Sequence, residues 1–300
     1  GFGESYCGGD LAPKIKGCGV DAVILQGAAR ELTFLTVDEQ GVRHRLCAVT
    51  AVEDIRQITR MMAPKPCIIA DGHHRYTTGL RFAEESGHPG ARYQMMALTN
   101  VCQQGLVVLG THRLVRGLRD FDGDGLLAGL QGSFHLERWP FTTPGEKARA
   151  RDSMQARMKD AFEHGQTALG VYFGQGAFYL ARLRDRHAMA AAAPAMSPAW
   201  HELDVAVLHT LVLERHLGIT PEKRTEGRLI TYVKDTASGL DEAVAQVDAG
   251  VQQVGFFLNP IQIRQLFAVT DQGQRMPQKS TFFYPKMFTG LTVQILDPMD

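Results

Sequence analysis

"LITYVKDTASGLDEAVAQVDAGVQQVGFFLN", residues 229–259, shows the pattern from which the fold class follows. An apolar run at 229–233, a helical stretch at 239–250 and a second apolar run at 254–259 follow one another. Short runs rich in β-branched and aromatic residues between turn residues indicate strands. Further helical stretches at 202–218 and 261–269 extend the alternation. Strands that alternate with helices predict an α+β protein, with a mixed sheet packed by helices.

The first half of the chain has the same mixture of elements. Alternating residues at 30–49 around a turn at 39–41 predict a hairpin, and helical spacing predicts a helix at 51–62. We expect strands at 67–70, 93–100, 106–110 and 133–141, a helix from about residue 77 to residue 86, then a helix at 144–164 and a hairpin around 174–176. An alanine-rich stretch at 187–198 predicts a boundary between domains at 1–186 and 199–300, with both packed into one unit as the alternative.

The overall charge argues against a polyanionic partner. The 32 Lys and Arg residues equal the 32 Asp and Glu residues, so the protein has no net field that would attract nucleic acid. No apolar stretch reaches the ~20 residues that span a bilayer, so no membrane partner is expected. The five cysteines form no CxxC pair, which is typical of reduced thiols in a cytoplasmic protein.

"IIADGHHRYTTGL", residues 68–80, contains the strongest candidate site. A helix start offers free backbone N–H groups and a positive dipole end, and Gly72 would let the backbone approach a phosphate. Arg75 can bind phosphate oxygens with two N–H groups, while Asp71, His73 and His74 are the candidate catalytic residues. The alternative is that Asp71 caps the helix and the histidines are surface residues. Zinc is disfavoured, because adjacent histidines point in different directions.

Two later stretches contain similar basic and hydroxyl-bearing residues that could bind phosphate. "LGTHRLV", residues 109–115, places polar residues after an apolar run, and "RMPQKSTFFYPK", residues 275–286, is rich in phosphate-binding residue types. The second stretch lacks the GxxxxGK of a P-loop, and two prolines that shape a loop would also explain it. We expect residues 71–75 and 275–286 to meet in space. The candidate phosphate-binding residues of the two stretches are Thr111, His112, Arg113, Lys279, Ser280, Thr281 and Lys286.

The motifs "ADGHHRY", "THRLV", "LDVAVLH" and "MPQKSTFFYPK" occur in the order seen in the family DUF1015, a domain of unknown function, which the chain resembles from about residue 22 to residue 296. Position 110 departs from the family, because Gly110 stands where proline is usual, and this predicts a looser turn before His112. The loop at 72–75 is also similar to the glycine-X-X-arginine loop of ParB and sulfiredoxin-like nucleotide-binding proteins. Within that group, free-serine kinases carry a similar Asp-Gly-His-His-Arg loop.

The resemblance implies a small-molecule phosphotransferase, with a free L-serine kinase that uses a nucleotide or pyrophosphate donor as the specific case. It implies Mg²⁺ with ATP, ADP or pyrophosphate, with Asp71 as the metal ligand, and a small acceptor such as L-serine. Two alternatives stay open. One is a histidine-dependent phosphate-ester hydrolase with His73 or His74 as nucleophile or general acid. The other is a regulator that binds nucleotide or phosphate without catalysis.

Overall fold

A computed structural model describes residues 35–39, 42–46, 49–70, 72–101 and 106–284. The chain divides into two compact units, unit 1 with Gly1–Ala97 and Met287–Asp300, and unit 2 with Leu98–Lys286. The alanine-rich stretch at 187–198, where a boundary was expected, lies inside unit 2. Strands from both sides of it belong to one sheet.

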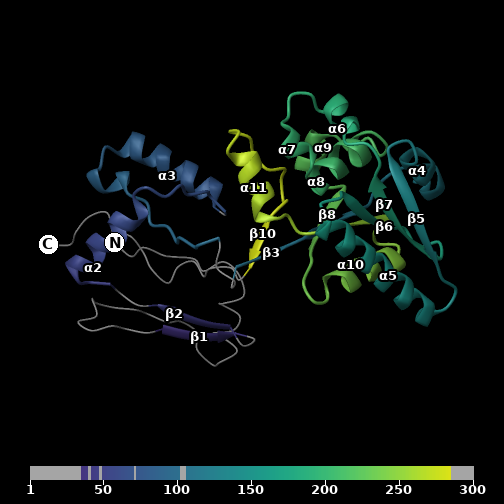
Figure 1. Ribbon diagram of the computed structural model, residues 1–300, viewed down its shortest axis with the longest axis horizontal. Coiled ribbons are helices and arrows are strands. Elements are labelled where there is room, and N and C mark those ends of the chain that lie inside the picture. The colour runs from purple at the N-terminus through teal and green to yellow at the C-terminus, as the bar shows by residue number, and fades with distance from the viewer. Residues whose placement is uncertain (1–34, 40–41, 47–48, 71, 102–105, 285–300) are drawn as a thin grey trace. The chain divides into compact units, whose positions relative to one another are not determined.

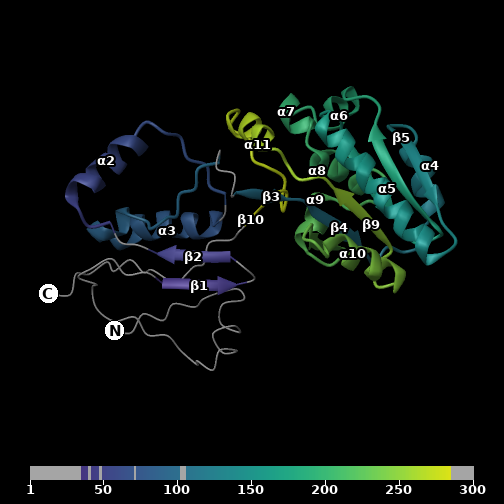
Figure 2. The ribbon, with the colours of Figure 1, turned by 60° about the horizontal axis from the view of Figure 1, so that its bottom comes forward.

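The described residues of unit 1 form a hairpin and two α-helices (Figure 2). Strands β1 (Leu35–Glu39) and β2 (Val42–Leu46) pair antiparallel, which confirms the predicted hairpin. Helix α2 (Val52–Met62) confirms the predicted helix, and α3 (His73–Ser86) is followed by a 3-10 turn, η1 (Pro89–Arg92). The strands predicted at 67–70 and 93–100 are wrong, because both runs are irregular. A strand needs a hydrogen-bonded partner, and apolar composition alone does not provide one.

Unit 2 is built around a six-stranded sheet with the order β5-β7-β6-β9-β4-β8. Every neighbouring pair in this sheet is antiparallel, so the pairing is more uniform than the mixed sheet that the sequence predicted. The α+β class is confirmed. The strands are β4 (Thr111–Val115), β5 (Phe134–Pro140), β6 (Ala168–Tyr172), β7 (Ala177–Leu183), β8 (Ile230–Lys234) and β9 (Val254–Leu258).

Helices cover both faces of this sheet (Figure 1). The first face packs against α4 (Gly123–Leu130), α6 (His187–Ala192), α8 (Asp204–Val207) and a π-helix, η2 (Leu208–Glu214). The second face packs against α5 (Pro144–Glu163) and α10 (Gly239–Asp248). Three further helices complete unit 2: α7 (Pro198–His201), α9 (Pro221–Thr225) and α11 (Ile263–Thr270).

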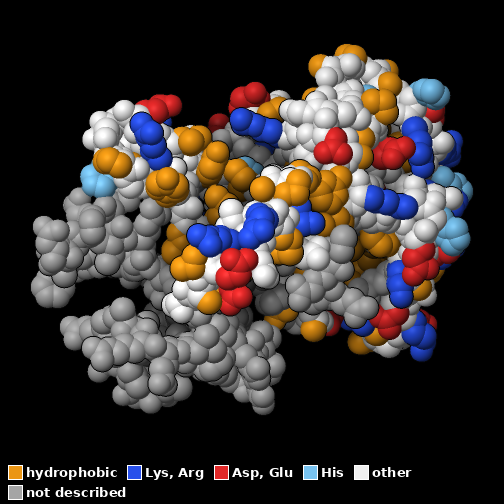
Figure 3. Space-filling model, turned by 60° about the vertical axis from the view of Figure 1, so that its left-hand side comes forward, with side chains coloured by type: hydrophobic (Ala, Val, Ile, Leu, Met, Phe, Trp, Pro, Cys, Tyr) orange, Lys and Arg blue, Asp and Glu red, His pale blue; other side chains and the backbone are white. Residues whose placement is uncertain are grey.

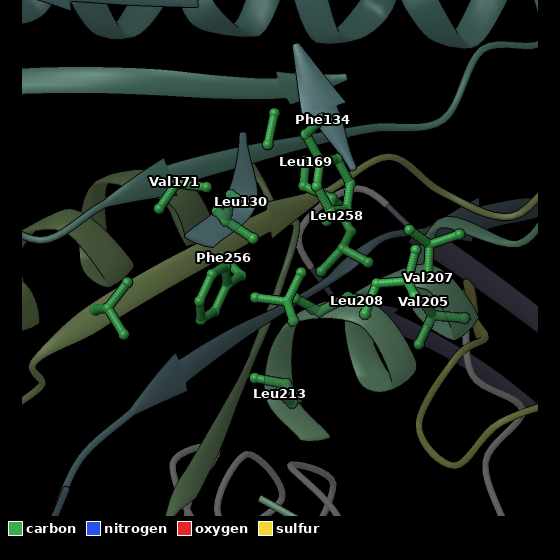
Figure 4. Close-up of a cluster of buried hydrophobic side chains, with 14 of the residues drawn as sticks. Leu130, Phe134, Leu169, Val171, Val205, Val207, Leu208, Leu213, Phe256 and Leu258 are labelled. Carbon is green, nitrogen blue, oxygen red and sulfur yellow. The ribbon is translucent and has the colours of Figure 1, made fainter. Parts of the chain in front are cut away.

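Successive side chains along the strands point alternately into the two hydrophobic cores, one on each face of the sheet. In β9, Phe256 and Leu258 point into the first core (Figure 4), while Phe257 points into the second. In β4, Val115 belongs to the first core and Leu114 to the second. Successive residues of a strand face opposite sides, so this central strand is buried on both faces. The same alternation places Arg113 on the side of Val115 and His112 on the side of Leu114.

A small second sheet fixes the segment that contains the MPQKST motif. Strand β10 (Phe282–Tyr284) pairs antiparallel with β3 (Val107–Leu109), which lies directly before β4. Phe282 is opposite Leu109, so residues 275–281 lead up to the start of β4. The pairing therefore brings the THR and MPQKST motifs together, although they are far apart in the sequence.

Candidate functional site

The first candidate site is the start of helix α3 in unit 1. Gly72 is the N-cap residue, with φ 88° and ψ 27°, in the left-handed region that favours glycine. The helix begins at His73, four residues before the predicted start, and its first hydrogen bond runs from the N–H of Tyr76 to the Gly72 carbonyl. The N–H groups of the first turn have no acceptor within the helix. His73, His74 and Arg75 therefore lie where a helix binds anions.

Arg75 folds back over this helix start. A Cβ atom added to Gly72 would lie 3.0 Å from Nη2 and 3.2 Å from Nε of Arg75. The positive φ favours glycine at position 72, and an added Cβ would also displace the flexible Arg75 side chain by a few tenths of an ångström. The side chains of His73, His74 and Arg75 are exposed. Asp71 lies outside the described residues, so its catalytic and metal-binding roles stay predictions.

The THR motif lies in a strand, β4. β3 ends at Leu109 and β4 begins at Thr111, so the two strands are separated by Gly110 alone. Thr111, His112 and Arg113 are 7%, 3% and 1% exposed. Gly110 does not loosen the turn as predicted, because an added Cβ would lie 2.8 Å from the backbone carbonyl oxygen of Leu258. The phosphate-binding roles of the three motif residues stay predictions.

Both ring nitrogens of His112 face protein groups. Nδ1 accepts a hydrogen bond from the backbone N–H of Leu258 at 3.3 Å. Nε2 lies 3.3 Å from Oδ1 of Asp235, an electrostatic contact that lacks good hydrogen-bond alignment. The ring also packs edge-on against Phe257, with 5.4 Å between ring centroids. These contacts describe a histidine that is held in place on the second face of the sheet.

Arg113 connects β4 to the MPQKST segment. Its Nη1 donates to the carbonyl of Thr111, and its Nη2 donates to the carbonyls of Lys279 at 2.8 Å and Gln278 at 3.4 Å. The guanidinium carbon also lies 5.5 Å from the centre of the Tyr232 ring. Burial lowers the pKa of Arg113 to about 10, and the nearby Tyr232 hydroxyl opposes this shift. The guanidinium remains charged at neutral pH.

The MPQKST segment holds its lysine in an unusual conformation. Lys279 has φ 54°, in the left-handed region, and its side chain is exposed. Ser280 is 6% exposed, and Thr281 is partly buried. Lys286 lies outside the described residues. The α3 start belongs to unit 1 and Lys279 to unit 2, so the expectation that the two loops meet stays a prediction.

Two buried titratable residues were missed as functional candidates. Asp204 is the first residue of α8, and burial raises the pKa of its carboxyl group to about 7. His209 lies in π-helix η2 and is 4% exposed, and burial holds its pKa well below the usual value, with Arg113 and Arg224 adding to the effect. Both residues lie inside the apolar run at 203–213, and a polar residue within such a run indicates a buried polar group that needs an explanation.

Asp204 lies on the wall of a small cavity. The cavity has a volume of about 110 Å³ and is also lined by Glu202, Asn259, Gln262 and Arg264. Hydrogen bonds from Asn259, Thr167 and the Ala168 N–H lower the pKa of Asp204, but burial has the larger effect. The residue keeps some exposed surface at the cavity, while protein atoms surround its carboxyl group.

On the face shown in Figure 3, basic and acidic side chains are interspersed. The described residues contain no group of three or more His, Cys, Asp or Glu residues that could hold a metal ion. Nor do they include a helix with the length and apolar character needed to span a membrane.

The fold and these sites define an α+β protein with a glycine-capped, arginine-covered helix start. The chain belongs to the family DUF1015, described as proteins of unknown function, whose family model matches residues 16–206. The match includes the DGHHR and THR motifs and ends before MPQKST. No curated protein is similar enough to match the chain.

Several solved structures show a remote similarity. A free serine kinase in complex with AMP is 11% identical, with 84% of this chain and 86% of that chain covered and a TM-score of 0.36. A variant of a free serine kinase in complex with ADP is 14% identical, with 79% and 82% covered and a TM-score of 0.36. A conserved hypothetical protein from Pyrococcus furiosus is 11% identical, with 86% and 93% covered and a TM-score of 0.34.

Proposed function

We propose that this protein is a small-molecule phosphotransferase whose donor phosphates bind at the start of helix α3. The observation that carries the proposal is the left-handed Gly72 with the Arg75 guanidinium folded over it. Backbone N–H groups of the first turn and the positive end of the helix dipole favour a bound phosphate. Arg75 adds two N–H donors in a geometry that fits two phosphate oxygens.

Phosphoryl transfer requires mainly positioning and positive charge around the transferred group. In this proposal, His73 and His74 donate hydrogen bonds to the donor phosphates. Asp71 has one of two alternative roles: it accepts the proton of the attacking hydroxyl group, or it binds Mg²⁺. Mg²⁺, when bound, would neutralise charge on the phosphates of ATP, ADP or pyrophosphate. Magnesium is usually held by one or two carboxylates together with phosphate oxygens, and Asp71 is the carboxylate proposed for that role.

The finer proposal is that the acceptor is an alcohol such as L-serine. Support comes from the Asp-Gly-His-His-Arg loop, which resembles the loop of free-serine kinases. Incubation of the protein with L-serine and each donor, followed by mass analysis for a phosphorylated product, tests the acceptor directly. D-Serine is the matched control, because it has the same charge and size but places the hydroxymethyl group differently.

Binding can be tested before any assay of activity. Thermal unfolding is measured with ATP, ADP and pyrophosphate, each with and without Mg²⁺, for the parent protein and for Arg75→Ala. A ligand at a hundredfold excess over its dissociation constant stabilises the native state by about 2.7 kcal/mol. We expect a stabilising donor whose effect is lost in Arg75→Ala. Arg81→Ala is the control, because Arg81 is exposed on the same helix two turns away.

The outcomes separate the proposal from its alternatives. Transfer that requires a donor and an acceptor supports the phosphotransferase. Phosphate release from a simple ester without Mg²⁺ or acceptor would indicate a histidine-dependent hydrolase, and binding without any product would indicate a regulator. If no phosphate compound stabilises the folded protein, the proposed site is wrong.

A further inference from the structure

We infer that the turn formed by Gln278, Lys279 and Ser280 in unit 2 is an anion contact, in which Lys279 supplies the charge and Arg113 is the residue that positions it. The choice of anion, a phosphoryl or pyrophosphoryl group, rests on the proposed function. The geometry lies within unit 2 and involves no residue of unit 1. The inference also changes the role expected for Arg113, from a ligand contact to a positioning residue.

The backbone of Lys279 is the first step. A residue with a side chain is unfavourable at φ 54°, because its Cβ atom crowds the backbone, and glycine or asparagine is usual there. Such conformations persist where the surroundings impose them, and they cluster at functional sites. Lysine at this position therefore lowers the stability, and within the described residues its exposed ammonium group makes no ion pair that would compensate.

Arg113 is the group that imposes the conformation. Its Nη2 donates to the carbonyls of Lys279 and Gln278, so one nitrogen holds two successive peptide groups of the turn. Its Nη1 donates to Thr111 of its own strand, which fixes the guanidinium group relative to the sheet. Arg113 is 1% exposed, and its hydrogen-bond acceptors here are backbone carbonyls rather than a carboxylate. Burial of a charged arginine costs free energy, and the N–H groups of Arg113 hold the backbone of this turn in place.

The burial of Arg113 also excludes a direct contact with a ligand in this conformation. Lys279 follows Gln278 on the exposed side of the turn, so the exposed charge at this point is the lysine. A second ammonium group lies at the same end of the sheet. Lys234 is the last residue of β8, opposite Thr111, and its Nζ lies 4.2 Å from the centre of the Phe282 ring. Asp235, the next residue, faces His112.

The test measures pyrophosphate affinity and thermal stability of the full chain. Lys279→Gly removes the charge and relieves the backbone, so we expect a melting temperature equal to or above that of the parent and an affinity about tenfold weaker. Lys279→Arg keeps the charge and should restore most of the affinity. Lys159→Gln is the control for net charge, because Lys159 is an exposed lysine of helix α5 in the same unit. Its affinity should equal that of the parent.

A double-mutant cycle tests the positioning role of Arg113. Arg113→Lys keeps the charge but cannot hold two carbonyls with a planar group, so alone it should weaken pyrophosphate binding. In the Lys279→Gly background the same substitution should cause no further loss of affinity, because the charge that Arg113 positions is gone. Equal losses in both backgrounds would show that Arg113 does not act through Lys279.

Other outcomes overturn the inference or separate it from the proposed function. Unchanged affinity in Lys279→Gly refutes the contact, and so does a large loss of stability in that variant. If Arg75→Ala abolishes binding while Lys279→Gly does not, the inference fails and the proposed function stands. If Lys279→Gly weakens binding while Arg75→Ala does not, the α3 site fails and the inference stands. A parent protein that does not bind pyrophosphate refutes the inference.

Discussion

His112 accepts a hydrogen bond at Nδ1 from the backbone N–H of Leu258, across 146 positions of the sequence. Because Nδ1 accepts this hydrogen bond, the N–H of the ring is on Nε2, which faces Asp235. The hydrogen bond joins the second residue of β4 to the last residue of β9. His112 therefore has a clear structural role at the end of the sheet where the THR and MPQKST motifs meet.

Two amide substitutions of His112 test that role. Asparagine can place its side-chain oxygen near the position of Nδ1, whereas the longer glutamine reaches toward the position of Nε2. His112→Asn should keep the acceptor for the Leu258 N–H, and His112→Gln should leave that buried group unpaired, at a cost of about 1–3 kcal/mol. We expect the free energy of unfolding to be lower for glutamine than for asparagine. Equal values in chemical denaturation would contradict the assigned hydrogen bond.

Gly72 and Gly87 form a matched pair at the two ends of helix α3. Both have positive φ, 88° and 63°, but only at Gly72 would a Cβ approach another group, the Arg75 side chain. Alanine at either position should cost about 1–2 kcal/mol of local backbone strain. Only Gly72→Ala should displace Arg75 and weaken phosphate binding. The thermal shift with the most stabilising phosphate donor measures this difference. Equal weakening of phosphate binding in both variants would contradict the proposed role of Arg75.

Gly110 is expected to be sensitive to substitution because the chain is tightly packed there. A Cβ atom would lie 2.8 Å from the Leu258 carbonyl oxygen, so Gly110→Ala must shift the backbone of β9 or of the β3–β4 junction. Such overpacking typically costs about 1–3 kcal/mol. Gly132→Ala is the control, because its nearest neighbour would be 3.6 Å away. Denaturant unfolding that shows no difference between the two variants would argue against the close approach.

Much of the fold could be predicted from local pattern, and the failures have physical causes. The helix α5 and the hairpin of β6 and β7 follow their sequence periodicity closely. The start of α3 was placed four residues late, since residues 73–76 are polar and a left-handed glycine replaces the usual side-chain cap. The strand at Thr111 was missed because β3 and β4 follow each other with one glycine between them.

The candidate sites also differ in whether a local sequence pattern predicts them. The DGHHR loop was found because its residue types and its helix lie within a few positions of one another. The contact of Arg113 with Lys279 spans 166 positions, and no local pattern encodes it. His209 carried a signal that was not used, a histidine between Leu208 and Leu211 in an apolar helical run.

Asp204 predicts how stability depends on pH. Its folded-state pKa of about 7 lies above the ordinary aspartate pKa of 3.8, so between these pH values the folded state holds a proton that the unfolded state releases. The stabilising contribution is therefore fully present below about pH 4 and is lost as the pH rises to about 7. The upper limit of this contribution to the free energy of unfolding is about 4 kcal/mol, at about 1.36 kcal/mol for each pKa unit.

Substitution of Asp204 by asparagine removes this titration while keeping the size of the side chain. The free energy of unfolding of the parent, minus that of Asp204→Asn, should decrease from pH 4 to pH 7 and stay constant above it. The comparison uses the slope with pH, because asparagine also changes the hydrogen bonds from Thr167 and Asn259. Asp152→Asn, at an exposed carboxylate of α5, is the control for a general charge effect. A parent and an Asp204→Asn variant with parallel pH profiles would show that the carboxyl group titrates normally in the folded protein.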